Sequence, residues 1–73
     1  MFERETYDAP VSEGTTYDVA IEDIAREGDG IARVQGFVVF VPDTKIGDNV
    51  KIKVDKVMRR FAIASVTERI LNR

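Results

Sequence analysis

The sequence contains no cysteine and no histidine, and these two absences exclude several kinds of site. Without thiols the chain forms no disulfide, and without thiols or imidazoles it lacks the usual ligands of structural zinc. No apolar run approaches the roughly 18 residues that a membrane-spanning helix needs. The N-terminal stretch MFERETYDAP also lacks the basic and apolar regions of a secretory signal. We therefore expect a soluble, cytoplasmic protein that has no membrane partner.

No constellation of residues indicates catalysis. The densest carboxylate groups are Glu22-Asp23 and Glu27 with Asp29, but they lack the ligand order of a calcium loop. No neighbouring base or nucleophile suggests acid–base chemistry. The string Gly28-Asp29-Gly30 is too short to form a phosphate-binding loop. The sequence therefore predicts no enzymatic activity, no metal and no cofactor.

The charges are distributed unevenly along a chain of only 73 residues, which is at most one domain. Residues 1–30 carry nine acidic and two basic side chains (net −7), and residues 31–73 carry nine basic and four acidic ones (net +5), so the total is −2. Such asymmetry can support a nucleic-acid-binding face even when the isoelectric point is low. Solvated strand edges and an acidic tail are the alternative explanation.

Five short segments between closely spaced turn signals have the pattern of β-strands. In the first, Tyr17, Val19 and Ile21 alternate with polar or small residues, which is the period of a half-buried strand. Residues 1–13 show no sustained period and carry four acidic side chains and a proline. We therefore expect a flexible N-terminal tail there and a domain over residues 14–73. The five expected strands cover residues 16–24, 30–34, 37–41, 49–57 and 60–66.

The length and spacing of these segments, without a competing helical period, favour a small all-β barrel of five antiparallel strands. Closure of a barrel removes the exposed edges that a short sheet would offer to other chains. An open five-stranded meander is the alternative architecture. In the fourth segment Val57 falls out of phase with Val54, so we expect a β-bulge near Asp55-Lys56 if both valines face the core.

The run FVVFVP, residues 37–42, is more apolar than one strand of a single-layer barrel can bury. Only alternate residues of a strand face inward, so Val38 and Phe40 face outward if the other two valines fill the core. Phe37 has the inward parity, but it directly follows a glycine and can belong to the turn. By the same alternation, Phe61 faces outward if the alanines of the last segment face inward.

Exposed aromatic rings beside cationic side chains are suited to single-stranded nucleic acid, because every base offers a π face and every linkage a phosphate. The alternative is that the phenylalanines pack beneath the N-terminal tail or in a dimer contact. The cationic neighbours that we expect for the rings are Arg33, Lys53, Arg59 and Arg60.

Four elements of the sequence together resemble the TRAM domain, a small barrel appended to several tRNA-modifying enzymes and found as a stand-alone protein in archaea. The resemblance runs from about Gly14 to Val66 and is specific as a set. The four elements are Tyr17-Asp18-Val19-Ala20-Ile21, Gly28-Asp29-Gly30-Ile31-Ala32-Arg33-Val34, Gly36-Phe37-Val38-Val39-Phe40-Val41-Pro42 and Gly47-Asp48-Asn49-Val50.

The resemblance implies an OB-like β-barrel that acts as an RNA chaperone similar to bacterial cold-shock proteins. Such proteins bind structured RNAs such as tRNA and 5S rRNA with little sequence specificity. No methyltransferase or radical-enzyme domain is expected here, in contrast to the fused members, so no catalysis is implied. Carried over by position, the RNA-binding surface would comprise Arg33, Phe37, Phe40, Lys53, Arg59, Arg60 and Phe61.

An alternative of a different class is a protein-interaction module whose exposed rings dock on a ribosomal or RNA-modifying protein. Salt separates the two, because RNA binding weakens steeply with salt and an apolar contact does not. A small-ligand-binding barrel is disfavoured, since so small a barrel leaves no internal cavity. The sequence does not determine which RNA is bound, and a monomer is the expected oligomeric state.

Overall fold

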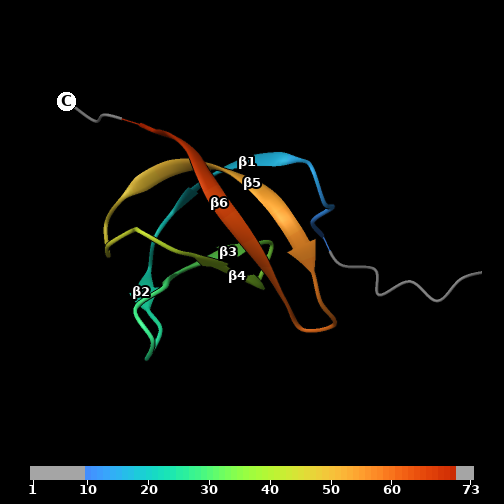
Figure 1. Ribbon diagram of the computed structural model, residues 1–73, viewed down its shortest axis with the longest axis horizontal. Helices are drawn as coiled ribbons and strands as arrows, with labels where there is room; N and C mark the ends of the chain where they lie inside the picture. The colour runs from blue at the N-terminus through green and yellow to red at the C-terminus, as the bar shows by residue number, and fades with distance from the viewer. Residues whose placement is uncertain (1–9, 71–73) are drawn as a thin grey trace, which may run out of the picture.

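Six β-strands curl into a small barrel in the computed structural model, which describes residues 10–70 (Figure 1). The all-β class and the OB-like barrel are confirmed, and the described residues include no helix that could cross a membrane. Along the sheet the strands follow the order β1-β5-β6-β4-β3-β2. Their bounds are β1 Thr16–Ala20, β2 Asp23–Ile24, β3 Gly30–Val34, β4 Phe37–Val41, β5 Asn49–Val57 and β6 Phe61–Arg69.

The two edge strands of the sheet, β1 and β2, are consecutive parts of the chain, so the sheet must curl to bring its two edges together. β1 pairs with β5 at one edge and β2 pairs with β3 at the other. Between them the backbone N–H of Ile21 donates to the carbonyl of Asp48 (2.9 Å), and the next N–H, of Glu22, donates to the carbonyl of Ile31 (2.8 Å). The chain therefore changes partner strands within one residue. In Figure 1, β6 passes in front of the β3–β4 hairpin, and β5 lies beside β6 on the other side.

Three details differ from the sequence-based expectation, the first being that β6 extends to Arg69, three residues beyond the expected end of the last strand. The single strand expected over residues 16–24 is divided into β1 and β2, because the chain turns a corner at Ile21 while keeping that side chain buried. The strands are also not all antiparallel, since β4 and β6 are parallel. A parallel pair needs a crossover connection, which β5 and its flanking loops supply. The resulting strand order is not sequential, so the sheet is not the open meander either.

The core is built from aliphatic side chains of small and medium size. In β5, Val50, Ile52 and Val54 are almost completely buried, whereas Lys53 between them is exposed, as the alternation predicted. Val11 is only 4% exposed, so packing includes a residue before Gly14. Residues 1–9 of the expected tail and residues 71–73 of the expected domain lie outside the described residues. The buried hydrophobic residues are Val11, Ile21, Ala32, Val39, Val41, Val50, Ile52, Val54, Ala62 and Ala64.

A β-bulge lies where the sequence predicted one. The register of β5 against β6 shifts between Val54 and Lys56, so Asp55 has no residue opposite it. The Asp55 carboxylate instead accepts a short hydrogen bond from the hydroxyl of Ser65 on β6. After the bulge the alternation is reversed, so Val57 packs against the core and Lys56 is exposed.

Gly30 is required by a close approach of the loop that follows β4. The glycine is buried, and a Cβ there would collide with Oγ1 of Thr44 and lie 3.1 Å from the carbonyl oxygen of Val41. The Thr44 hydroxyl is itself buried and donates a hydrogen bond to that same carbonyl (2.8 Å). A side chain at position 30 would therefore displace the contact that holds the start of the β4–β5 loop.

We predict that Gly30→Ala lowers the free energy of unfolding by about 1 to 3 kcal/mol, because the added methyl group overpacks this contact. Urea unfolding followed by circular dichroism measures the loss. The matched control is Gly30→Ala in a Thr44→Ala background, where the colliding hydroxyl is gone and the cost should be smaller. An equal cost in both backgrounds would contradict the steric explanation.

Candidate nucleic-acid interface

The outward-facing side chains of β3, β4 and β6 form one surface, which we call the aromatic face. The registers place them in two rows across the strands. Neighbouring residues of a strand point to opposite sides of a sheet, so both rows face away from the buried valines and alanines. The first row is Arg33, Val38 and Phe61, and the second row is Ile31, Phe40 and Ile63.

Phe40 and Phe61 contact each other on the aromatic face. Their ring centroids are 5.3 Å apart and the ring planes meet at 74°, which is an edge-to-face arrangement. Such a pair contributes about 0.5 to 1.5 kcal/mol beyond the burial of its area. Both rings are half-buried, so part of each ring is accessible. The pair therefore presents two oriented aromatic surfaces without a ligand to arrange them.

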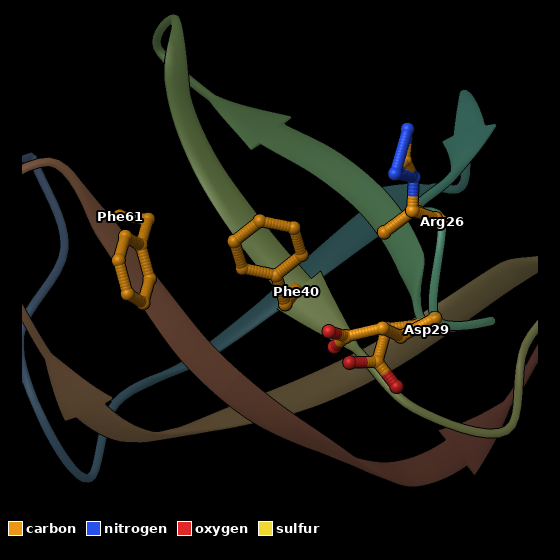
Figure 2. Close-up of a pocket in the computed structure, with 6 residues that line it drawn as sticks. Arg26, Asp29, Phe40 and Phe61 are labelled. Carbon is orange, nitrogen blue, oxygen red and sulfur yellow. The ribbon is translucent and has the colours of Figure 1, made fainter.

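An open pocket with a volume of about 370 Å³ lies between this ring pair and the β2–β3 turn (Figure 2). Hydrogen bonds from the Ala25 N–H to the Asp29 carbonyl (2.7 Å) and from the Gly28 N–H to the Ala25 carbonyl (2.8 Å) hold the turn in place. Figure 2 shows Phe40 between Phe61 on one side and the turn residues on the other. The pocket is lined by Ala25, Arg26, Glu27, Asp29, Phe40 and Phe61.

Sequence reasoning considered the carboxylates of the β2–β3 turn only as candidates for catalysis or metal binding, and missed their position beside the rings. Within residues 10–70 no group of three or more carboxylates is arranged to hold a metal ion. The proximity of Asp29 to Phe40 depends on how the turn folds over the aromatic face. No spacing within the sequence signals that the two residues line one pocket.

The predicted cationic residues of the strands lie at different distances from the ring pair. Arg33 is in the same row as Phe61, and its side chain is 51% exposed although its Nε lies 3.9 Å from the carboxylate of Glu22. An ion pair this exposed contributes little to the stability of the fold, so the Arg33 guanidinium can leave Glu22 to pair with a phosphate. Lys53 is opposite Ser65, four residues beyond Phe61 on β6, which is roughly 13 Å along the strand.

Lys56, which sequence reasoning did not single out, lies closer to the rings than Lys53 does. It is exposed and stands opposite Ile63, the neighbour of Phe40 in the second row. Its outward direction follows from the β-bulge at Asp55. The bulge that the sequence predicted reverses the alternation after Asp55 and so turns Lys56 outward. This lysine could therefore have been identified from the sequence.

Arg59 and Arg60 occupy the β5–β6 turn directly before Phe61. The turn is closed by a hydrogen bond from the Met58 N–H to the Phe61 carbonyl (2.7 Å), and both arginines are exposed. The turn thus places two guanidinium groups next to the start of β6, where the ring pair lies. These two arginines, Phe61, Phe40 and Arg33 are the predicted site residues that the structure brings together.

Phe37 lies on the opposite side of the sheet from the ring pair, and so is separated from it in a different way than Lys53 is. Gln35 and Gly36 both have positive φ (54° and 83°), which is the conformation of a two-residue type I′ hairpin turn. The strand therefore begins at Phe37, and its inward parity applies. The ring is half-buried and packs against the core, on the side of the sheet opposite Phe40.

A small OB-like barrel with accessible rings and cationic side chains on one face is typical of nucleic-acid-binding barrels. The model of the TRAM domain family matches residues 10–67, and the chain belongs to this family. The TRAM domain is an RNA-binding module, so family membership supports RNA binding by the barrel described here.

Proteins similar to this chain occur in several archaea. It is 60% identical over 55 residues to an uncharacterized protein of Methanocaldococcus jannaschii, covering 75% of this chain and 71% of that one. It is 47% identical over 62 residues to a ribosomal RNA large subunit methyltransferase E of Methanothrix thermoacetophila, covering 85% of this chain. It is 44% identical over 59 residues to a translation initiation factor 2 subunit beta of that organism, covering 81% of this chain. The chain spans 24% and 28% of those two longer proteins.

A solved structure has the same fold. The solution structure of a conserved protein of Methanococcus maripaludis superposes on this barrel with a TM-score of 0.81 at 43% sequence identity. The match covers 89% of this chain and 93% of that one.

We predict that Phe40→Ala weakens binding to a single-stranded RNA by about 1 to 3 kcal/mol, because a stacking surface is lost. Its effect on the free energy of unfolding should be smaller than that of the control Val39→Ala, which removes methyl groups from the fully buried neighbour. Fluorescence anisotropy gives the affinity and urea unfolding gives the stability. Unfolding of the Phe40 variant together with normal binding by its folded fraction would show that the ring has only a structural role.

Proposed function

We propose that this protein is an RNA chaperone that acts in the manner of a cold-shock protein, binding tRNA, 5S rRNA or other RNAs with low sequence specificity. The observation that carries the proposal is the accessible Phe40–Phe61 pair on an outer face that has cationic side chains around it. Stacking on such rings is tolerant of sequence because every base has a π face.

In this proposal the rings and the cations have separate roles. Phe40 and Phe61 stack on unpaired bases, and Arg33, Arg59 and Arg60 pair with phosphates or stack on bases, since a guanidinium is both planar and charged. Lys53 and Lys56 on β5 add to the positive field along the path of the backbone. Phe37 packs against the core on the other side of the sheet and so stabilises the strand that carries Phe40.

Chaperone activity follows from preferential binding to the single strand. A protein that binds unpaired RNA more tightly than paired RNA shifts the folding equilibrium of the RNA toward open states by mass action. The aromatic face is open, so bound RNA is not enclosed and can dissociate and pair again. Misfolded helices are thereby given further attempts to fold, without catalysis and without a cofactor.

The names of two similar proteins support structured RNA as the partner. One name refers to ribosomal RNA and the other to translation initiation, and both processes involve structured RNAs. We therefore propose that this chain binds a structured RNA such as tRNA or 5S rRNA. We propose that it does so as a monomer in the cytoplasm.

A hairpin RNA that carries a fluorophore and a quencher at its ends tests the chaperone function. We predict that excess protein raises the fluorescence by opening the stem, and that the Phe40→Ala/Phe61→Ala double variant does so far less, because it lacks both stacking rings. The control is Ile46→Ala, which changes an exposed apolar residue of the β4–β5 loop, outside the aromatic face. Tight binding without opening would leave an RNA-binding protein that is not a chaperone.

The salt dependence of affinity separates RNA binding from docking on a protein. If about four to six phosphates are neutralised, the logarithm of the association constant should fall with the logarithm of salt concentration with a slope of about −3 to −4. Titrations of a single-stranded RNA at several salt concentrations give the slope. A slope near zero would remove the electrostatic part of the proposal and favour a protein partner bound through the apolar face.

A further inference from the structure

The pocket beside the ring pair has polar lining groups that general stacking does not use. Its rim carries the carboxylates of Glu27 and Asp29 against the single cation of Arg26, so its formal charge is −1. A phosphate is repelled from such a rim, whereas the β5 side of the aromatic face attracts it. The group suited to this pocket is therefore a flat, uncharged ring that can lie on Phe40.

Asp29 is the better-placed carboxylate of the two. Its side chain is half-buried, and its backbone carbonyl accepts the hydrogen bond that closes the β2–β3 turn (2.7 Å from the Ala25 N–H). Glu27 is exposed and longer, so it is less restricted. Figure 2 shows Asp29 and Arg26 on the same side of the Phe40 ring, opposite Phe61, and all of them line the pocket. A base stacked on Phe40 would thus present its edge to Asp29.

An ionised carboxylate only accepts hydrogen bonds, so it selects a base by the donors on its edge. Uracil offers one N–H between two carbonyl oxygens, which a carboxylate repels. Adenine and cytosine each offer an amino group next to a ring nitrogen that is itself an acceptor. Guanine alone offers two adjacent donors, the N1–H and the N2 amino group, and these match the two oxygens of one carboxylate.

The cation on the rim favours the same base. Guanine carries two acceptors, O6 and N7, and arginine is their most frequent partner in nucleic-acid recognition. N7 lies on a different edge from the two donors, and O6 lies between N7 and the N1–H. A pocket lined by both a carboxylate and a guanidinium therefore offers partners for the donors and for the acceptors of guanine.

We infer that the pocket between the Phe40–Phe61 pair and the β2–β3 turn is a guanine subsite, in which the base stacks on Phe40 and donates two hydrogen bonds to Asp29. The inference rests on the proposed RNA binding and adds a preference at one nucleotide position. A preference at one position is compatible with low specificity over the rest of the bound strand.

The test compares two single-stranded RNAs of about nine nucleotides, within the site size of one such barrel. Both are adenosine strands with one central substitution, guanosine in the first and inosine in the second. Inosine lacks the N2 amino group but keeps O6, N7 and the N1–H. The parent protein should bind the guanosine strand about tenfold more tightly by fluorescence anisotropy, because one hydrogen bond to a charged acceptor is lost with inosine.

Asp29→Ala should reduce the ratio of the two affinities toward one, and Asp29→Asn provides a second variant of nearly the same shape. The matched control is Asp18→Ala, which removes one negative charge from an exposed position of β1 outside the pocket. Asp18→Ala should change the affinities for the two strands by the same factor, whereas Asp29→Ala should weaken binding of the guanosine strand more than binding of the inosine strand. Only the Asp29 variants should lose the preference for guanosine.

A parent ratio near one, or an unchanged ratio in folded Asp29→Ala and Asp29→Asn, would overturn the guanine subsite. If binding is strong and sensitive to Phe40→Ala in that case, the proposed RNA binding stands without the subsite. If the parent binds neither strand, the proposed function fails and the subsite fails with it.

Discussion

A barrel this small has a narrow interior, and within residues 10–70 the side chains that are at most 2% exposed are all aliphatic. Three of them are alanines, Ala32, Ala62 and Ala64. Two described aromatic residues, Tyr17 and Phe37, reach the core only partly. Phe40 and Phe61 have the opposite parity, so the barrel cannot take them in. Exclusion from a small core is thus the physical reason why two rings are available for stacking, and the function that we propose depends on it.

The β-bulge at Asp55 connects the core with the aromatic face. Without an extra residue in β5, strand alternation would turn Lys56 toward the core and Val57 toward solvent. The bulge reverses both, which adds an apolar contact inside and a cation outside, opposite Ile63. Ser65 compensates the unpaired position by donating its hydroxyl to the Asp55 carboxylate. One irregularity therefore serves stability and the charge pattern of the surface together, and this makes it more than a defect in the pairing.

The sequence predicted the local features of the fold, such as strand positions and side-chain alternation. It did not predict the contacts that depend on pairing between distant strands. Alternation placed Phe40 and Phe61 on the outside on the condition that Val39 and Ala62 fill the core, which they do, and the phase change at Val57 predicted the bulge on a similar condition. The contact between the two rings depends on the parallel register of β4 with β6, which no local period encodes. The corner at Ile21 was missed because this side chain continues the inward alternation of β1. The hydrogen bonds of the backbone nevertheless pass there from the Asp48 carbonyl to the Ile31 carbonyl. The pocket was missed for the same reason, since the β2–β3 turn meets Phe40 only in the folded chain.

The uneven charge along the sequence becomes an uneven charge across the aromatic face. The acidic first half supplies the β2–β3 turn on one side of the ring pair, and the basic second half supplies β5 and the β5–β6 turn on the other. At physiological salt, charges farther apart than about 8 Å are largely screened, so a bound strand responds to these local groups and hardly to the net charge of −2. In the complex that we propose, the phosphate backbone lies toward β5 and the bases extend over β4 toward the acidic turn. The charge gradient favours this orientation, because the reverse one would place phosphates against Glu27 and Asp29.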